Sequence, residues 1–183
     1  MESPEMSRPV MPGYGILGPE AGSGLLPWSW AAERLASSRN YWVSSAWPDG
    51  RPHSMPVWGM WDDGVLWFTC GVRSRKARNL RADPRCSVST EDASDPVIIE
   101  GTAQIMTDDT SIRRALDLMN EKYDSGIEIS FLDPARNSTI AVRPHKVIGM
   151  QHGDFTGSPT RWTFRGGSGA EGDHHDRPGG GAG

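Results

Sequence analysis

The chain has 183 residues, with 19 basic and 23 acidic side chains and a formal net charge of −4 at pH 7. This length suits one domain with a substantial hydrophobic core. No run approaches the roughly 20 apolar residues of a membrane-spanning helix, and the first thirty residues lack the apolar core of a signal peptide. Cys70 and Cys86 do not form a CxxC pair, which favours reduced thiols. We therefore expect a cytoplasmic protein without a membrane partner.

The two ends of the chain are rich in glycine and proline. Residues 1–27 contain Pro and Gly throughout, and we expect them to form a disordered leader. Residues 166–183 are Gly-rich and polar, and we expect a disordered tail there. His174 and His175 lie in this tail between acidic residues, but a flexible segment offers no fixed geometry for a metal, so we expect no metal site. The folded domain is expected to span residues 28–165.

The first half of this domain predicts a short helix and then strands. Ser29 is the expected N-cap of the helix, and Trp30, Arg34 and Leu35 follow at helical spacing. The aromatic and β-branched residues then predict three strands joined by tight turns at residues 48–51 and 62–64, an antiparallel meander. The expected strands are 41–47, 53–61 and 65–69.

A short basic helix is predicted next, over residues 75–82. Ser74 is its expected N-cap, and the Asp83-Pro84 step should end it, because a residue before proline avoids the helical region. Residues 73–85 contain six basic side chains and one acidic side chain, although the whole chain is acidic. A helix N-terminus presents free N–H groups and the positive end of the helix dipole. The segment therefore predicts a binding site for an anion, most simply a phosphate.

The second half predicts more strands and one longer helix. The expected strands are 86–91, 97–106, 139–150 and 161–164, with Pro144 on an edge or at a bulge. Residues 109–123 predict the helix, because Ile112, Ala115, Leu116 and Met119 form an apolar stripe. The complete pattern is mainly β: six or seven antiparallel strands with two or three helices, in a closed or nearly closed barrel.

These elements, in this order, resemble the pyridoxamine 5′-phosphate oxidase-like split-barrel flavoproteins. The motifs that carry the resemblance are Gly50-Arg51-Pro52-His53, Met55-Pro56-Val57-Trp58, Leu66-Trp67-Phe68-Thr69, Ser74-Arg75-Lys76-Ala77-Arg78-Asn79-Leu80, Asp83-Pro84-Arg85 and Glu100-Gly101-Thr102-Ala103. They fall within residues 28–165, nearly all of the expected folded domain. The resemblance implies a split β-barrel that dimerises, with two equivalent cofactor sites between the subunits.

The resemblance also implies which residues bind the cofactor. Arg75 and Lys76 would hold its phosphate, with Ser74 and Thr69 as hydrogen-bond donors, and Asn79 lies close to them in the sequence. The backbone of Met55, Pro56, Val57 and Trp58 would line the flavin-like ring. Arginine meets two phosphate oxygens with a planar fork and lysine adds a compact charge, so the chemistry agrees. No catalytic acid can be assigned, and His53 is expected to be structural.

The choice of cofactor depends on finer features. The Arg-x-His substrate signature of the true oxidases is missing, because this chain has Arg161-Trp162-Thr163-Phe164. The Pro-Val-Trp, Ser-Arg-Lys-x-Arg-Asn-Leu and Thr-Arg-Trp motifs resemble the branch that uses coenzyme F420. That cofactor continues past its phosphate into an acidic glutamyl tail, and Arg73, Arg78 and Arg81 could meet it. The expected activity is hydride transfer between the deazaflavin and an unsaturated small-molecule substrate.

Two alternatives stay open. One is an FMN-dependent oxidoreductase of the same fold. The other is a non-catalytic carrier for the cofactor, for heme or for another flat anion, because a fold does not fix a function. A nucleic-acid partner is not expected, since the basic residues form one short helix on an acidic protein.

Overall fold

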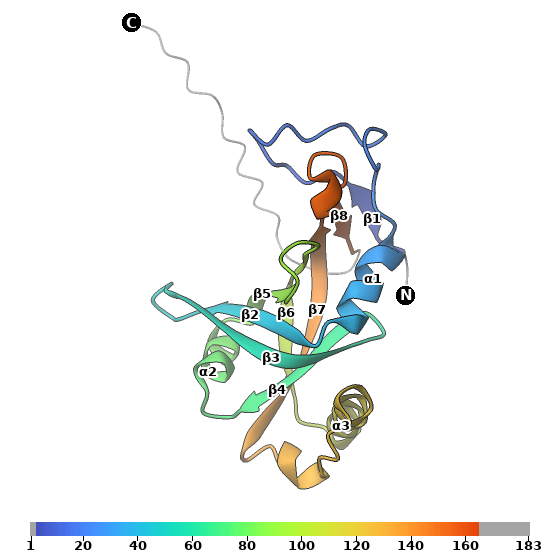
Figure 1. Ribbon diagram of the computed structural model, residues 1–183. Helices are drawn as coiled ribbons and strands as arrows, with labels where there is room; N and C mark the ends of the chain where they lie inside the picture. Colours follow the sequence, from blue (N-terminus) through green and yellow to red (C-terminus); the bar gives the residue numbers. More distant parts are fainter. Residues whose placement is uncertain (1–2, 165–183) are drawn as a thin grey trace, which may run out of the picture.

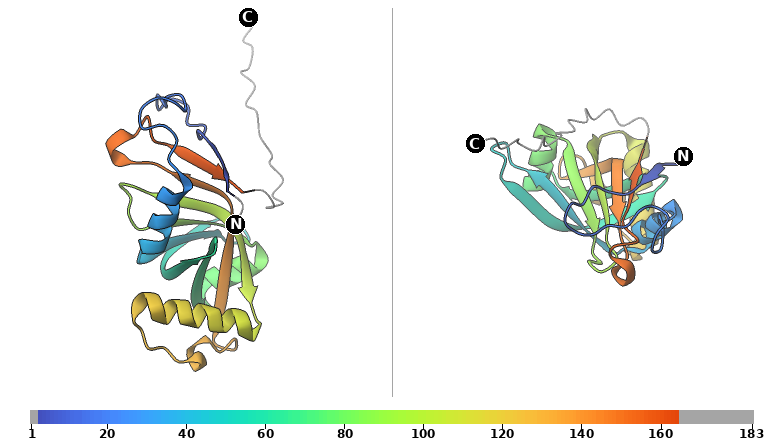
Figure 2. Two further views of the ribbon diagram at one scale, coloured as in Figure 1. Left: turned by 90° about the vertical axis from the view of Figure 1, so that its right-hand side faces the viewer. Right: turned by 90° about the horizontal axis from the view of Figure 1, so that it is seen from above.

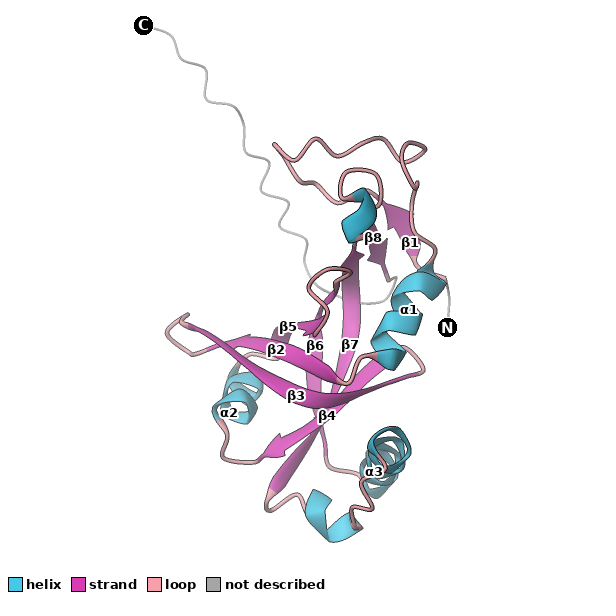
Figure 3. Cartoon of the chain, in the orientation of Figure 1, coloured by secondary structure: helices cyan, strands magenta, loops and turns pink. Residues whose placement is uncertain are grey.

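The computed structural model of the protein describes residues 3–164. Strands dominate, and the three α-helices lie at separate places around them (Figure 3). The elements are β1 (Glu5–Ser7), α1 (Trp28–Ser37), β2 (Asn40–Ala46), β3 (Pro52–Asp62), β4 (Val65–Gly71), α2 (Arg75–Ala82), β5 (Arg85–Thr90), β6 (Val97–Met106), α3 (Asp109–Tyr123), the 3-10 turn η1 (Ile129–Leu132), β7 (Asn137–Gly149), the 3-10 turn η2 (His152–Asp154) and β8 (Thr160–Thr163).

Six antiparallel strands close into a barrel. Their order is β7-β4-β3-β2-β5-β6, and β6 returns to pair with β7. Outside the barrel, β8 pairs with β7 and β1 pairs with β8, so the sheet continues as a short extension (Figure 1). This arrangement confirms the expected mainly β antiparallel barrel. Strand boundaries within the barrel agree with the expected ones to within two residues.

Two clusters of buried side chains hold the molecule together. The larger one fills the barrel and includes Tyr41, Phe68 and Ile99, none of which is exposed to solvent. The smaller one lies between α3 and the barrel and includes Met60 and Met119. Figure 2 shows α3 at the opposite end of the molecule from the N-terminal segment. The apolar stripe predicted for residues 109–123 therefore faces the barrel, as amphipathic helices do.

Tryptophans connect the start of the domain to its end. Trp28 of α1 makes edge contacts with Trp61, Trp162 and Phe164, at ring separations of 6.1, 5.7 and 5.1 Å. Edge-to-face aromatic pairs add to the free energy gained by burying the rings. These contacts hold α1 and β8 on the barrel, and they account for several tryptophans as packing residues.

A β-bulge interrupts the pairing of β6 and β7. Glu100 pairs with Lys146 but the next residue, Gly101, pairs with Pro144, so His145 has no partner on β6. A Cβ at Gly101 would lie 2.4 Å from the Arg143 carbonyl oxygen, which is why glycine is needed at this close approach. The prediction that Pro144 lies on an edge or at a bulge is confirmed.

Two expectations about the N-terminal region are wrong. The first helix begins at Trp28 with Pro27 as its N-cap residue, so Ser29 lies inside the first turn. Residues 3–27 are not a structureless leader, because β1 pairs with β8 and the following loop is fixed by Arg8. The Arg8 guanidinium donates to the carbonyl oxygens of Gly18, Ala21, Gly24, Gly157 and Pro159, at 2.7 to 3.3 Å.

Composition could not reveal this because the segment is ordered by contacts with residues 154–163, such as those of Arg8 and the bond from Leu26 N–H to the Thr160 hydroxyl, and not by a repeating pattern. The expected tail, residues 166–183 with His174 and His175, lies outside the described residues. Among residues 3–164, no helix combines the length and the apolar character that crossing a membrane would require.

Candidate functional site

The basic helix α2 forms where the sequence predicts it. The Ser74 side chain accepts the Ala77 N–H at 3.2 Å, which is an N-cap bond. Asp83, in an extended conformation before Pro84, ends the helix. Neither Arg75 N–H nor Lys76 N–H has an acceptor among the described residues. These two amides are therefore available to an anion.

The Lys76 side chain is mostly buried, and its ammonium group has no counter-ion within residues 3–164. The residue is 7% exposed, and no hydrogen bond within the same range involves its ammonium group. Burial lowers the pKa of Lys76, while the Cys70 side chain raises it partly. A buried charge costs free energy unless it is paired. An anion bound beside Lys76 would supply the counter-ion that the described residues do not.

Arg75 lies next to Lys76 but contacts the β2–β3 hairpin. Its guanidinium carbon is 3.5 Å from the centre of the Trp47 ring, and no described hydrogen bond uses its N–H groups. Arg51, from the same hairpin, lies 4.3 Å from that ring centre and is paired with Asp49 at 2.9 Å. Trp47 thus contacts two arginines, of which only Arg51 has an acidic partner.

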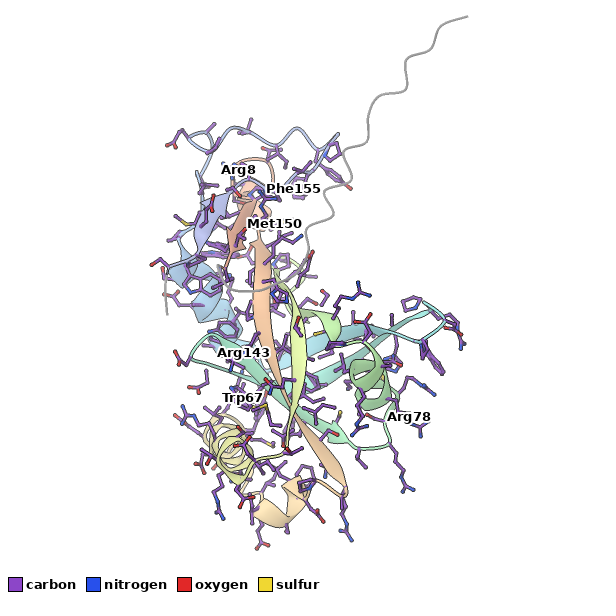
Figure 4. The ribbon with its side chains drawn as sticks, turned by 180° about the vertical axis from the view of Figure 1, so that it is seen from behind. Arg8, Trp67, Arg78, Arg143, Met150 and Phe155 are labelled. Atoms are coloured by element: carbon purple, nitrogen blue, oxygen red, sulfur yellow. The ribbon has the colours of Figure 1, made fainter. Side chains whose placement is uncertain are left out.

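Asn79 fastens α2 to the barrel. It is 1% exposed, and its amide Nδ2 donates to the Ser45 hydroxyl of β2 at 3.1 Å. Its Oδ1 atom is buried and has no partner among the described atoms. Ala77 and Leu80 are also buried, whereas Arg78 is exposed and lies on the side of α2 that faces away from the barrel (Figure 4). The helix therefore presents Lys76 and Asn79, but not Arg78, to the interior.

The barrel is split beside this helix. β3 pairs with β4 only from Gly59 to Asp62, so among the described residues β2 is the only strand paired with residues 52–58. Thr69, the next residue on β4 after this pairing ends, pairs with Thr139 of β7 on its other side. α2 packs against β2, β3 and β4, at the place where β3 and β4 diverge (Figure 1). The split gives β3 an open backbone edge near the N-terminus of α2.

The register shows which backbone groups point to this edge. Trp47 N–H donates to Arg51 C=O, so these two residues form a hydrogen-bonded pair of the antiparallel ladder. Counting along the register from this pair, the backbone N–H and C=O groups of odd-numbered residues of β3 point toward β2. The backbone N–H and C=O groups of even-numbered residues of β3 therefore point toward the split. Pro52 and Pro56 lack an N–H and occupy such positions, where no ladder bond is lost. Trp58 N–H and the carbonyl oxygens of Pro56 and Trp58 are left for a ligand.

The four residues expected at the cofactor ring divide between two environments. Val57 is 8% exposed and packs in the barrel core, and its backbone groups face Tyr41 of β2, so it does not contribute to the open edge. Met55 and Trp58 are each 49% exposed, and Pro56 is exposed as well. Trp42 of β2 is 46% exposed and pairs with Pro56. Trp42, Pro56 and Trp58 thus form an apolar surface on the outer side of β2 and β3, next to the open edge, whereas Met55 lies on the face of Val57.

Trp58 is held in place by α3. Its ring stacks on Tyr123 with centroids 4.5 Å apart and planes 7° from parallel. The Tyr123 hydroxyl in turn accepts Gly59 N–H at 2.8 Å, and Lys122 Nζ donates to the Gly59 carbonyl oxygen at 2.8 Å. Trp58 was expected from the motif, but its support by the end of α3, more than 60 residues away, has no local signal in the sequence.

A groove of about 660 Å³ adjoins the start of α2. It lies between residues 71–74 and residues 135–136, and it carries the exposed Arg73 and Arg136. Neither arginine forms an ion pair within residues 3–164. Arg136 was not among the expected residues, because the loop after η1 brings it here from a distant part of the chain. Arg81, by contrast, donates to Val72 C=O and the Ser138 hydroxyl, so it braces the fold.

A second pocket of about 480 Å³ lies on β2, β5, β6 and the β7 bulge. His145 lines it, and its Nε2 lies 2.6 Å from the Thr102 hydroxyl. Glu100 also lines it and is paired with Lys146 at 2.7 Å. Burial raises the pKa of the Cys86 thiol to about 12, so this cysteine is a poor nucleophile. In this pocket Glu100 is therefore paired and Cys86 is inert, whereas His145 Nδ1 is buried without a hydrogen-bond partner among the described residues.

Comparison with known proteins identifies relatives by sequence and by structure. A sequence profile described as pyridoxamine 5′-phosphate oxidase matches residues 30–150, whereas no curated protein matches the chain. A conserved hypothetical protein of Mycobacterium tuberculosis is 25% identical with a TM-score of 0.63, over 69% of this chain and 86% of that protein.

Two further solved structures show the range of proteins with this fold. An F420 reductase is 27% identical with a TM-score of 0.53, over 63% of this chain and 93% of that protein. A heme-binding protein of Mycobacterium smegmatis is 17% identical with a TM-score of 0.54, over 70% of this chain and 60% of that protein. The second likeness concerns the fold alone.

Proposed function

The chain belongs to the pyridoxamine 5′-phosphate oxidase family, and we propose that it is an oxidoreductase that uses coenzyme F420 at the split between β3 and β4. The observation that carries this proposal is Lys76, a residue only 7% exposed in the first turn of α2, whose ammonium group has no counter-ion within residues 3–164. A phosphate there would meet Lys76, the free N–H groups of Arg75 and Lys76, and the unused guanidinium donors of Arg75.

The ring of the cofactor would lie along the open edge of β3. A flavin or deazaflavin presents alternating acceptors and a donor on its pyrimidine edge. Trp58 N–H and the Pro56 carbonyl oxygen offer the complementary pair. Thr69, at the end of the β3–β4 pairing, would donate its hydroxyl between ring and phosphate. This assignment uses the backbone of Pro56 and Trp58 alone, because the backbone groups of Met55 and Val57 face β2.

The groove beyond the phosphate position favours F420 over FMN. FMN ends at its phosphate, whereas F420 continues into a glutamyl tail with several carboxylates. Arg73 and Arg136 flank the groove of about 660 Å³ at this place, and neither is neutralised by an ion pair within residues 3–164. The likeness to an F420 reductase at 27% identity supports the same choice.

The cofactor supplies hydride transfer, and the residues of this chain supply binding and orientation. Arg75 and Lys76 fix one end of the cofactor, and the edge of β3 fixes the plane of the ring. Trp58, held by Tyr123, would border the ring on the outer side of β3. The substrate is a small molecule with an unsaturated bond that approaches the exposed face of the ring.

A second copy of the chain is proposed to complete the site. Trp42, Pro56 and Trp58 expose an apolar surface on the outer side of β2 and β3, beside the open edge. Burying such a surface against the same surface of another subunit gives a two-fold homodimer. Sedimentation analysis should give twice the monomer mass, and Trp42→Glu should shift the protein to the monomer.

Titration of purified protein with F420, reduced F420 and FMN tests the proposal. Calorimetry should give micromolar or tighter binding of F420 and weaker binding of FMN. Mixing the reduced complex with quinones, nitroaromatics or enones should reoxidise it. Tight FMN with no F420 binding would support the FMN alternative. Tight binding of F420 without turnover of any acceptor would support a carrier.

A further inference from the structure

The indole of Trp47 contacts two arginines that differ in how their donors are used. Arg75 and Arg51 lie 3.5 and 4.3 Å from its ring centre. Arg51 Nε donates to both oxygens of Asp49, at 2.9 and 3.1 Å. For Arg75, no hydrogen bond or ion pair occurs within residues 3–164. The two guanidinium groups share one ring; Arg51 uses its Nε–H on Asp49, whereas no donor of Arg75 is used within residues 3–164.

A face contact with an aromatic ring suits a guanidinium that must also bind an anion. The ring attracts the cation through its π face and does not use the N–H donors, which lie in the guanidinium plane. A free arginine loses conformational entropy when it orders around a ligand. Holding Arg75 in place before the ligand arrives removes part of this cost.

The position of Trp47 explains how the contact arises. It follows β2 at the tip of the β2–β3 hairpin, and its N–H donates to Arg51 C=O at 2.8 Å. The hairpin projects past the barrel and α2 lies beneath it (Figure 1). Ser45, two residues before Trp47, accepts a hydrogen bond from Asn79 of α2 at 3.1 Å. Hairpin and helix are therefore tied together one turn away from the contact between Trp47 and Arg75.

We propose that Trp47 is a positioning residue: its indole holds the Arg75 guanidinium so that its N–H donors face the phosphate of the bound cofactor. This rests on the proposed function for the identity of the cofactor, but not for the presence of an anion site. Trp47 itself makes no contact with the anion. Trp47 therefore raises the affinity only for ligands that carry a phosphate.

The test compares ligands with and without the phosphate. Trp47→Leu should weaken F420 binding about tenfold, the size of a desolvated cation–π contact. It should leave binding of the phosphate-free deazaflavin riboside within twofold of wild type. Trp47→Phe should restore most of the loss, since a smaller π face remains. Arg51→Ala, which removes the paired arginine from the same ring, should change neither affinity by more than twofold.

A double variant separates positioning from a general structural effect. In an Arg75→Ala background, Trp47→Leu should cause no further loss of F420 affinity. The proposal is overturned if Trp47→Leu weakens the riboside as much as F420, or if its effect adds fully to that of Arg75→Ala. It is also overturned if the variant binds F420 as wild type does.

Inorganic pyrophosphate distinguishes failure of this proposal from failure of the proposed function. If neither F420 nor FMN binds wild type, the cofactor assignment is wrong. The anion site is then tested by the rise in melting temperature with pyrophosphate. Loss of that rise in Trp47→Leu, and its return in Trp47→Phe, supports positioning by Trp47. An unchanged rise in Trp47→Leu overturns it.

Discussion

The Tyr123 hydroxyl takes the place of a backbone hydrogen bond between β2 and β3. It accepts Gly59 N–H at 2.8 Å and lies 2.5 Å from the Arg39 carbonyl oxygen, to which it can donate. These are the two groups that the next narrow pair of the ladder would join. The same ring stacks on Trp58. One side chain of α3 thus completes the sheet and orients a residue of the candidate site.

Tyr123→Phe should destabilise the protein by about 1–3 kcal/mol, because buried Gly59 N–H is left without an acceptor. The phenyl ring can still stack on Trp58, so the loss reports on the hydroxyl alone. Urea denaturation of the two proteins measures the difference. Tyr14→Phe is the matched control, since Tyr14 is 59% exposed, and its stability should equal that of wild type. Equal stability of both variants would contradict this role for Tyr123.

Deprotonation of Lys122 should raise the free energy of unfolding as the pH rises from about 8 to 10.5. Burial, with the Arg39 guanidinium second, lowers the pKa of Lys122 to about 8 from its ordinary 10.5. In this window the folded protein releases a proton that the unfolded chain keeps, so the cost of the buried charge disappears as pH rises. Because Lys122 is partly exposed and screened, the gain should be about 1 kcal/mol, less than the full shift would give.

Other groups lower the free energy of unfolding as pH rises, so wild type must be compared with a variant that lacks Lys122. The pKa of Cys86 is raised by burial to about 12 from 9, and burial also raises the pKa of Tyr41. A raised pKa contributes stability that is lost as pH rises above the unfolded value. Urea denaturation of wild type and Lys122→Met at pH 7, 8 and 9 isolates Lys122. The stability of wild type relative to the variant should increase with pH; a constant difference would show that Lys122 does not titrate there.

Much of the barrel could be predicted because its determinants are local. Strand periodicity, the tight turns and the Ser74 cap each depend on a few adjacent residues, and the structure has these elements where they were expected. The polar side chain of Ser29 was misleading, because Pro27 and the aromatic packing of Trp28 set the start of α1 instead. β1 was missed because its pairing depends on β8, more than 150 residues away.

The candidate site was predictable only in part, for the same reason. The motif indicated Arg75, Lys76 and the strand at Trp58, but not that Lys76 is buried without a partner. Trp47, Tyr123 and Arg136 reach the site through the hairpin, the end of α3 and the loop after η1. Their positions depend on tertiary packing, which residue types and spacing do not reveal.

Lys76→Met should separate ligand binding from stability. Methionine fills a similar volume without a charge, so removing the unpaired ammonium should stabilise the ligand-free protein by about 1 kcal/mol. Loss of a charged hydrogen bond should weaken F420 binding by about 1.5–3 kcal/mol, roughly tenfold to a hundredfold. Arg78→Ala, on the exposed side of α2, is the control and should change neither quantity. A Lys76→Met protein that is much less stable would indicate a structural role.

Arg8→Ala should release the N-terminal segment while the barrel stays folded. The Arg8 guanidinium joins carbonyl oxygens of residues 18–24 to those of Gly157 and Pro159, and in Figure 4 it lies beside the loop that carries Phe155. No other residue type offers five N–H donors in one plane, so Arg8→Lys should keep the N-terminal segment in place only in part. Hydrogen exchange should accelerate in residues 17–26, and limited proteolysis should cut there, with little change in β2–β7. Arg113→Ala, an exposed arginine of α3, should leave exchange unchanged. If exchange accelerated throughout the barrel, Arg8 would support the whole fold rather than this segment alone.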